Sequence, residues 1–198
     1  MKQILSPGVL MQLAIATIRA PRPTLSRLQE LNLPRQALWE ALFLVVVVSV
    51  ILAELGNLAL VALAPAGTDA AQFLSPFAFG AIQFVILALS VVLIDKVGSA
   101  MGGHGRTEDA LLAVVWLQFV MICLQIVQTL FLFILPGIAA LILIGGLVLF
   151  LYLLTAFVTE LHGFESQGRV FAMIVFVMIG VALGLSLILS LLGVTVPR

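Results

Sequence analysis

Apolar residues run along most of this chain in stretches far longer than a soluble core helix needs. The longest, 110–159, contains no Asp, Glu, Lys, Arg or His over fifty consecutive residues. As one helix it would be about 75 Å long, more than twice the roughly 30 Å hydrocarbon core of a bilayer. Pro136-Gly137 interrupts it near the middle. The stretch therefore predicts two membrane spans joined by a tight turn.

Applied to the whole chain, the same criterion gives five spans. They run over about 37–63, 77–94, 110–135, 138–159 and 170–192. Backbone groups in lipid need partners within the segment or in a closed barrel, and these runs lack the in–out alternation of barrel strands. We therefore predict an all-α polytopic membrane protein: a bundle of five transmembrane helices preceded by short amphipathic interfacial helices. The predicted domains are an N-terminal arm, 1–35, and a transmembrane domain, 36–198.

The arm differs from the rest of the chain in being basic and amphipathic. Ser6 followed by Pro7 is typical of a helix start. Further on, Leu25, Leu28 and Leu31 recur on one helical face. The charged residues of the arm are Lys2, Arg19, Arg22, Arg27, Arg35 and the single acid Glu30. We expect the arm to lie on a cytoplasmic membrane surface and to bind anionic lipids.

A cleaved signal peptide is the competing interpretation of the N-terminus. Lys2 precedes an apolar stretch, and Ala14-Ile15-Ala16 has the form of a cleavage site. However, Pro7 and Gly8 break the apolar region, and the arginines after it favour retention over export. We therefore expect the arm to stay attached.

Composition excludes several classes of protein. Of 198 residues, 63% are hydrophobic and only 9% are charged, against roughly 25% charged in a soluble domain. Nine basic and nine acidic residues give no net charge, so we expect no nucleic-acid partner. The single cysteine, Cys123, cannot form an intramolecular disulfide.

Lysine and arginine positions predict the orientation. Arg198 alone would lie outside the cell if the N-terminus were cytoplasmic. The basic residues on the cytoplasmic side would then be Lys2, Arg19, Arg22, Arg27, Arg35, Lys96, Arg106 and Arg169. Such an excess of positive charge is typical of cytoplasmic loops. We expect the N-terminus inside and the C-terminus outside.

Polar residues within the spans form the first candidate site. Counting along the helices places several at similar depth in the outer half of the bilayer. The predicted network comprises Glu54, Asn57, Gln83, Gln118, Gln125 and Gln128. Such groups hold helices together by hydrogen bonds or line a proton or solute pathway, here through Glu54. We favour the first interpretation and keep the second as an alternative.

A second polar layer lies where spans end on the predicted cytoplasmic side. It contains both histidines of the chain, each close to carboxylates in the sequence. The predicted cluster comprises Asp95, Gly102, Gly103, His104, Glu160 and His162. Metal binding is one interpretation, but the spacing fits no zinc motif. The glycines resemble a phosphate-binding loop only loosely, because no strand precedes them. We favour a polar rim without metal, cofactor or catalytic residue.

Glycines at G-x-x-x-G spacing allow close approach of helices. Gly180 and Gly184 have this spacing in the last span, and Gly98 and Gly102 have it at the end of the second. We expect packing within the chain first and dimerisation second.

The arrangement resembles the Yip (Ypt/Rab-interacting protein) domain family in its short bacterial form. Besides five spans with the N-terminus inside, the resemblance rests on Met101-Gly102-Gly103-His104-Gly105, on Thr107-Glu108-Asp109-Ala110 with Trp116, and on Thr159-Glu160-Leu161-His162-Gly163-Phe164. It covers nearly the whole chain after residue 35. It implies a bacterial inner membrane location.

Eukaryotic members of that family are implied in vesicle trafficking, where they bind prenylated Rab-type GTPases and partner Yip proteins. The sequence given has neither their long acidic N-terminal region nor their Tyr-Gly-Pro signatures. The resemblance therefore implies architecture more than activity. We expect a non-enzymatic scaffold or adaptor that binds other membrane proteins or itself, or shapes the bilayer. A small transporter or channel is the alternative, and a metal-dependent enzyme is a third.

Overall fold

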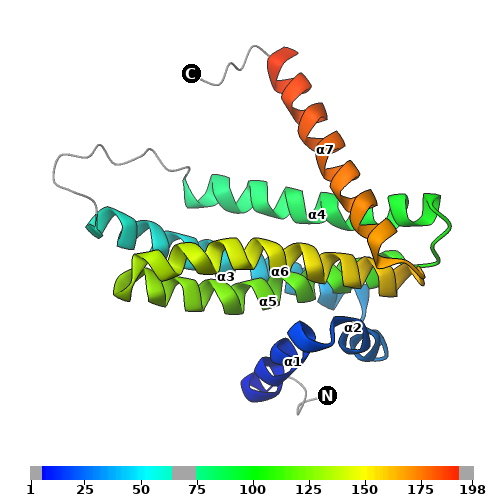
Figure 1. The fold of residues 1–198 in the computed structure, drawn as a ribbon, viewed down its shortest axis with the longest axis horizontal. Helices are drawn as coiled ribbons and strands as arrows, with labels where there is room; N and C mark the ends of the chain where they lie inside the picture. Colours follow the sequence, from blue (N-terminus) through cyan, green and yellow to red (C-terminus); the bar gives the residue numbers. More distant parts are fainter. Residues whose placement is uncertain (1–5, 64–74, 192–198) are drawn as a thin grey trace.

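In a computed structural model, residues 6–63 and 75–191 are described, and within these ranges the chain forms helices and loops without a strand. Five of the helices are long and apolar enough to cross a membrane. This confirms the predicted fold class (Figure 1). The elements are α1 (Pro7–Arg19), α2 (Pro21–Gln29), α3 (Arg35–Leu63), α4 (Pro76–Ala100), α5 (Thr107–Ile134), α6 (Pro136–His162) and α7 (Gln167–Leu191).

Helix α5 is the centre of the bundle, because α3, α4 and α6 all pack against it. Its N-terminal half is buried almost all round, including Leu111, Val114 and Leu117. The outer helices instead expose large apolar side chains, such as Phe77 on α4 and Leu141 on α6. Apolar exterior surface is what hydrocarbon surroundings require, and it distinguishes this bundle from a soluble one.

The chain turns sharply between α5 and α6. Leu135 has non-helical backbone angles, and Pro136 occupies the first turn of α6. A proline is tolerated there because the first backbone N–H groups of a helix have no intrahelical partner. The break predicted in the fifty-residue apolar stretch is therefore present.

The N-terminal arm folds back onto the bundle. Helix α2 packs against α5 and α6, and the side chain of Leu25 is fully buried with that of Leu28 nearly so. We had expected these leucines on the membrane surface, whereas they join the core that contains Leu38, Leu42 and Leu111. Only Leu31 of the predicted face is exposed. Burial against protein removes the same apolar area as burial in lipid, so the sequence pattern does not separate the two.

Helix α7 leaves the bundle. Within the described residues it packs only against α6, and Figure 1 shows it diverging from α4 beyond its first turns. The helix is amply long to span a bilayer, but much of its surface has no neighbour within the chain. Lys2 and Arg198, which entered the orientation argument, lie outside the described residues.

We call the end of the bundle that carries Lys96, Arg106 and Arg169 the basic end. The α4–α5 and α6–α7 loops both lie there.

Candidate functional site

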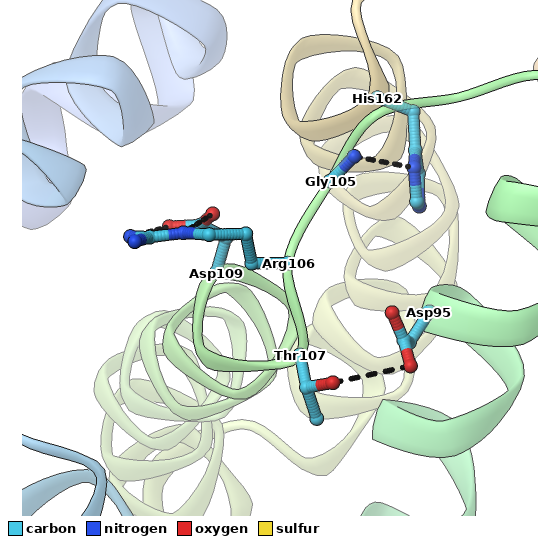
Figure 2. A network of polar contacts seen from close by, with 6 residues as sticks. All are labelled: Asp95, Gly105, Arg106, Thr107, Asp109 and His162. Atoms are coloured by element: carbon cyan, nitrogen blue, oxygen red, sulfur yellow. Dashed lines mark hydrogen bonds and ion pairs between the residues drawn. The ribbon is translucent and has the colours of Figure 1, made fainter.

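His162, the last residue of α6, is the centre of the polar contacts at the basic end. Its side chain is only 2% exposed. The backbone N–H of Gly105 donates to Nδ1 at 3.2 Å, and Nε2 lies 2.9 Å from the carbonyl oxygen of Ile94. An N–H can only donate and a carbonyl can only accept, so the ring is neutral with its proton on Nε2. His162 thereby joins α4, the α4–α5 loop and α6 (Figure 2).

Three glycines make room for this imidazole. A Cβ atom added at Gly98 or at Gly103 would overlap the His162 side chain. One at Gly105 would overlap Leu161 and approach the ring to 2.9 Å. We call Gly98, Gly103 and Gly105 around His162 the His162 socket. Gly102 serves a different purpose: its φ of 89° is a left-handed turn conformation that side chains disfavour.

The socket gives the glycine pattern a physical reason. The N–H of Gly105 is bonded to His162, and the N–H of Gly103 donates to the carbonyl of Gly98 at 2.9 Å. These groups are therefore not free to hold a phosphate. Gly98 and Gly102 have the spacing of a helix-packing pair, but in the structure Gly98 makes room for the His162 side chain and not for the backbone of a second helix.

Asp95 makes the second link between α4 and α5. It is nearly buried, and its Oδ2 accepts a hydrogen bond from the Thr107 hydroxyl at 3.2 Å and lies 3.2 Å from Lys96 Nζ (Figure 2 shows the Thr107 contact). At the same end, Arg106 Nε lies 3.1 Å from Asp109 Oδ2. The hydrogen bond and charge of Asp109 raise the pKa of Arg106 above its ordinary value, so this cation stays charged.

The other members of the predicted cluster point elsewhere. His104 is exposed, and its backbone N–H lies 3.4 Å from the His162 carbonyl oxygen. Glu160 turns to the arm, where its Oε2 lies 2.8 Å from Arg22 Nε. Across 6–63 and 75–191, no three His, Cys, Asp or Glu side chains lie close enough together to hold a metal ion.

A buried tryptophan fixes the arm. Trp116 Nε1 on α5 donates to the Thr17 hydroxyl at 2.9 Å, and that hydroxyl donates to the Leu13 carbonyl at 2.8 Å. Thr17 is fully buried. Sequence reasoning missed Thr17, because a single threonine in an apolar helix carries no signal of its own.

The predicted intramembrane network is divided in the structure. Ser49, which we had not singled out, joins three helices: Gln83 Nε2 donates to its hydroxyl at 2.7 Å and Gln125 Nε2 lies 3.4 Å from its carbonyl. Further along α5, Gln125 and Gln128 line a groove with Asn57, about 520 Å³ in volume, between α3, α5 and α6.

Two predicted members lie apart from that groove. Glu54 does not line it, and among the described residues it makes no hydrogen bond to Gln125, Gln128 or Asn57. Gln118 lines a separate cleft between α4, α5, α6 and α7.

Gly180 and Gly184 face open space in the structure. A Cβ at either position would meet no atom within 4 Å. By contrast, a Cβ at Gly146 on α6 would lie 2.8 Å from Leu124, so that glycine does permit close packing. Packing of Gly180 and Gly184 against another chain stays a prediction.

These features define a polytopic helical membrane protein whose loops at one end close around a buried histidine. The Yip1 domain family matches residues 15–188. The chain therefore belongs to the Yip1 domain family. No curated protein and no solved structure matches it. The match begins inside α1 and so includes all of α2 with the five spans.

Proposed function

We propose that this chain is a non-enzymatic membrane adaptor that binds another membrane protein, or a second copy of itself, through the open face of α7. The observation that carries the proposal is the unpacked G-x-x-x-G pair. Gly180 and Gly184 meet nothing within the chain, and Phe176 and Leu183 beside them are 77% and 66% exposed. Helices associate in lipid where small residues let their backbones approach closely.

The polar residues at the basic end support a structural role over catalysis. Both ring nitrogens of His162 are hydrogen-bonded to backbone groups. The Asp95 carboxylate accepts a hydrogen bond from Thr107 and pairs with Lys96. A general acid or base needs a free, correctly placed proton site facing a substrate. The side chains of this layer hold the loops in place.

In the proposed orientation the basic end faces the cytoplasm of a bacterial cell, in the inner membrane. The support is the positive-inside bias, which includes Lys96, Arg106 and Arg169 at that end. Cysteine probes at Ser99 and Gln167 should then react with a membrane-impermeant reagent only after permeabilisation. Labelling in intact cells would reverse the orientation.

Part of the arm is available to lipid. The face of α1 turned away from the bundle exposes Met11, Ile15 and Ile18, each between 45% and 48% exposed, beside the exposed Arg19. An apolar face flanked by basic residues suits the surface of an anionic leaflet. With the full chain reconstituted into anionic liposomes, replacing Arg19 and Arg27 by Gln should weaken the attraction of the arm to the leaflet by about 1 kcal/mol each and make a probe at Ile15 more accessible to water-soluble reagents. Equal accessibility of the Ile15 probe in this variant and in the otherwise unchanged chain would exclude the idea.

The adaptor proposal is tested by cross-linking in cells followed by mass spectrometry of the tagged chain. Gly180→Leu with Gly184→Leu fills the open face and should abolish specific cross-links. Gly145→Leu on α6 is the matched control, since a Cβ there also meets no atom within 4 Å. Identical cross-links from wild type and both variants would exclude α7 as the binding face.

Transport remains the second candidate, because the groove between α3, α5 and α6 lies within the spans and carries Asn57, Gln125 and Gln128 among mostly apolar lining residues. A solute or proton pathway needs such groups along its length. The position of Glu54 outside that groove favours the adaptor.

A further inference from the structure

The divergence of α7 leaves an apolar cleft between α4, α5, α6 and α7. Its volume is about 130 Å³, and its walls include Leu87, Leu93 and Val97 of α4, Phe150 and Val158 of α6, and Val177 of α7. Ser90 and Gln118 add the polar lining groups, and the Ser90 hydroxyl is turned to the Ile86 carbonyl of its own helix. An apolar cavity of about 150 Å³ admits benzene, so this one has room for a few methylene groups of a hydrocarbon chain. We call it the inner cleft.

The inner cleft has the depth of one leaflet. It extends along α4 from Gly98, near the basic end, to Leu87. At 1.5 Å per residue this is about 16 Å, close to half of a roughly 30 Å hydrocarbon core. Helices α4 and α7 both border the cleft, and α7 diverges from α4 beyond its first turns (Figure 1).

A polar pocket adjoins the cleft at the basic end. Met173 lines both cavities, so the two are neighbours on α7. The pocket has a volume of about 450 Å³, and its charged lining residues are Glu165 and Arg169. Neither side chain forms an ion pair with any part of the chain that the structure describes. The pocket therefore presents one free anion and one free cation above an apolar cleft of leaflet depth.

We propose that the inner cleft and this pocket bind one phosphatidylethanolamine molecule from the leaflet at the basic end. Part of one acyl chain lies in the cleft between α4 and α7, and the rest of that chain lies in the surrounding leaflet. Arg169 donates to the lipid phosphate, and Glu165 accepts hydrogen bonds from the primary ammonium group.

The paired charges favour this headgroup over its common alternatives. The quaternary ammonium of phosphatidylcholine has no N–H to donate to Glu165. Phosphatidylglycerol has no cation to balance that carboxylate, and a purely anionic headgroup meets like charge there. A zwitterion with an N–H donor satisfies both side chains.

The test is native mass spectrometry of the full chain after equilibration with the three lipids, each carrying identical acyl chains. Wild type should retain phosphatidylethanolamine about five- to tenfold better than either other lipid, as expected for one charge-assisted hydrogen bond at an exposed site. Glu165→Gln should remove the preference over phosphatidylcholine. Arg169→Gln should weaken the binding of all three lipids.

A second pair of variants tests the cleft. Val177→Trp fills it and should reduce retained phosphatidylethanolamine about tenfold or more, whereas Ile179→Trp, at an exposed position two residues on, should not. Both headgroup variants change exposed side chains, so they decide the question even if Val177→Trp fails to fold. Equal retention of all three lipids by wild type, a preference for phosphatidylglycerol, or a lipid-free dimer closed over the cleft would overturn the proposal.

Discussion

Substitution of Gly98 by alanine tests the His162 socket most sharply. A methyl group at Gly98 would overlap the imidazole of His162, which is 2% exposed. The ring cannot withdraw without losing its contacts to the Gly105 N–H and the Ile94 carbonyl. Overpacking a closed site costs about 1–3 kcal/mol, and each neutral hydrogen bond contributes about 1 kcal/mol. We therefore expect Gly98→Ala to lower the free energy of unfolding by about 2–4 kcal/mol.

The measurement is a double-mutant cycle with His162→Ala, followed by unfolding of the purified chain in detergent micelles. His162→Ala empties the socket, so Gly98→Ala in that background should be neutral, or stabilising by up to about 1 kcal/mol from helix propensity. The coupling between the two positions should then be about 3 kcal/mol. Gly180→Ala is the control, since a Cβ there meets nothing within 4 Å. Equal effects of Gly98→Ala in both backgrounds would refute the steric argument.

The arm, its ion pair and the intramembrane acid give three further predictions. Thr17→Val leaves the buried Trp116 N–H without an acceptor, so it should lower the free energy of unfolding by about 1–2 kcal/mol and speed trypsin cleavage of the arm. In a chain that already carries Trp116→Phe, the same substitution should be nearly neutral. Glu160→Gln should cost less than about 1 kcal/mol, and the cost should vanish at high salt, because the side chains of Arg22 and Glu160 are 40% and 24% exposed. Liposomes with a pH-sensitive dye should show no proton flux with wild type or Glu54→Gln; a wild-type flux lost in the variant would establish transport.

The long apolar runs made the spans predictable, because their length and lack of charge leave few alternatives to membrane helices. The presence of two spans followed from length, since fifty residues exceed one bilayer crossing, and Pro136-Gly137 placed the turn between them. The burial of Leu25 against the bundle could not be predicted from the sequence. The helical spacing of the leucines shows that they share an apolar face, but not whether protein or lipid covers that face.

The candidate site was only partly predictable for the same kind of reason. The glycines around His104 stood out in the sequence, but their partner is His162, more than fifty residues away in the chain. Such a pairing depends on how α4 and α6 pack. Ser49 and Thr17 carry hydrogen bonds between helices, yet hydroxyl residues also bond to their own helix backbone and so give no distinct pattern.

Site-specific photo-cross-linking on α7 tests the adaptor claim most directly. A photoreactive residue at Leu183 lies on the open face beside Gly184, whereas one at Leu147 on α6 is similarly exposed but lies apart from that face, the two side chains being 66% and 61% exposed. Irradiation of living cells should give a discrete protein adduct from position 183, either with a second copy or with one other membrane protein, and none from position 147. The absence of any protein adduct at 183, or identical adducts at both positions, would contradict the account.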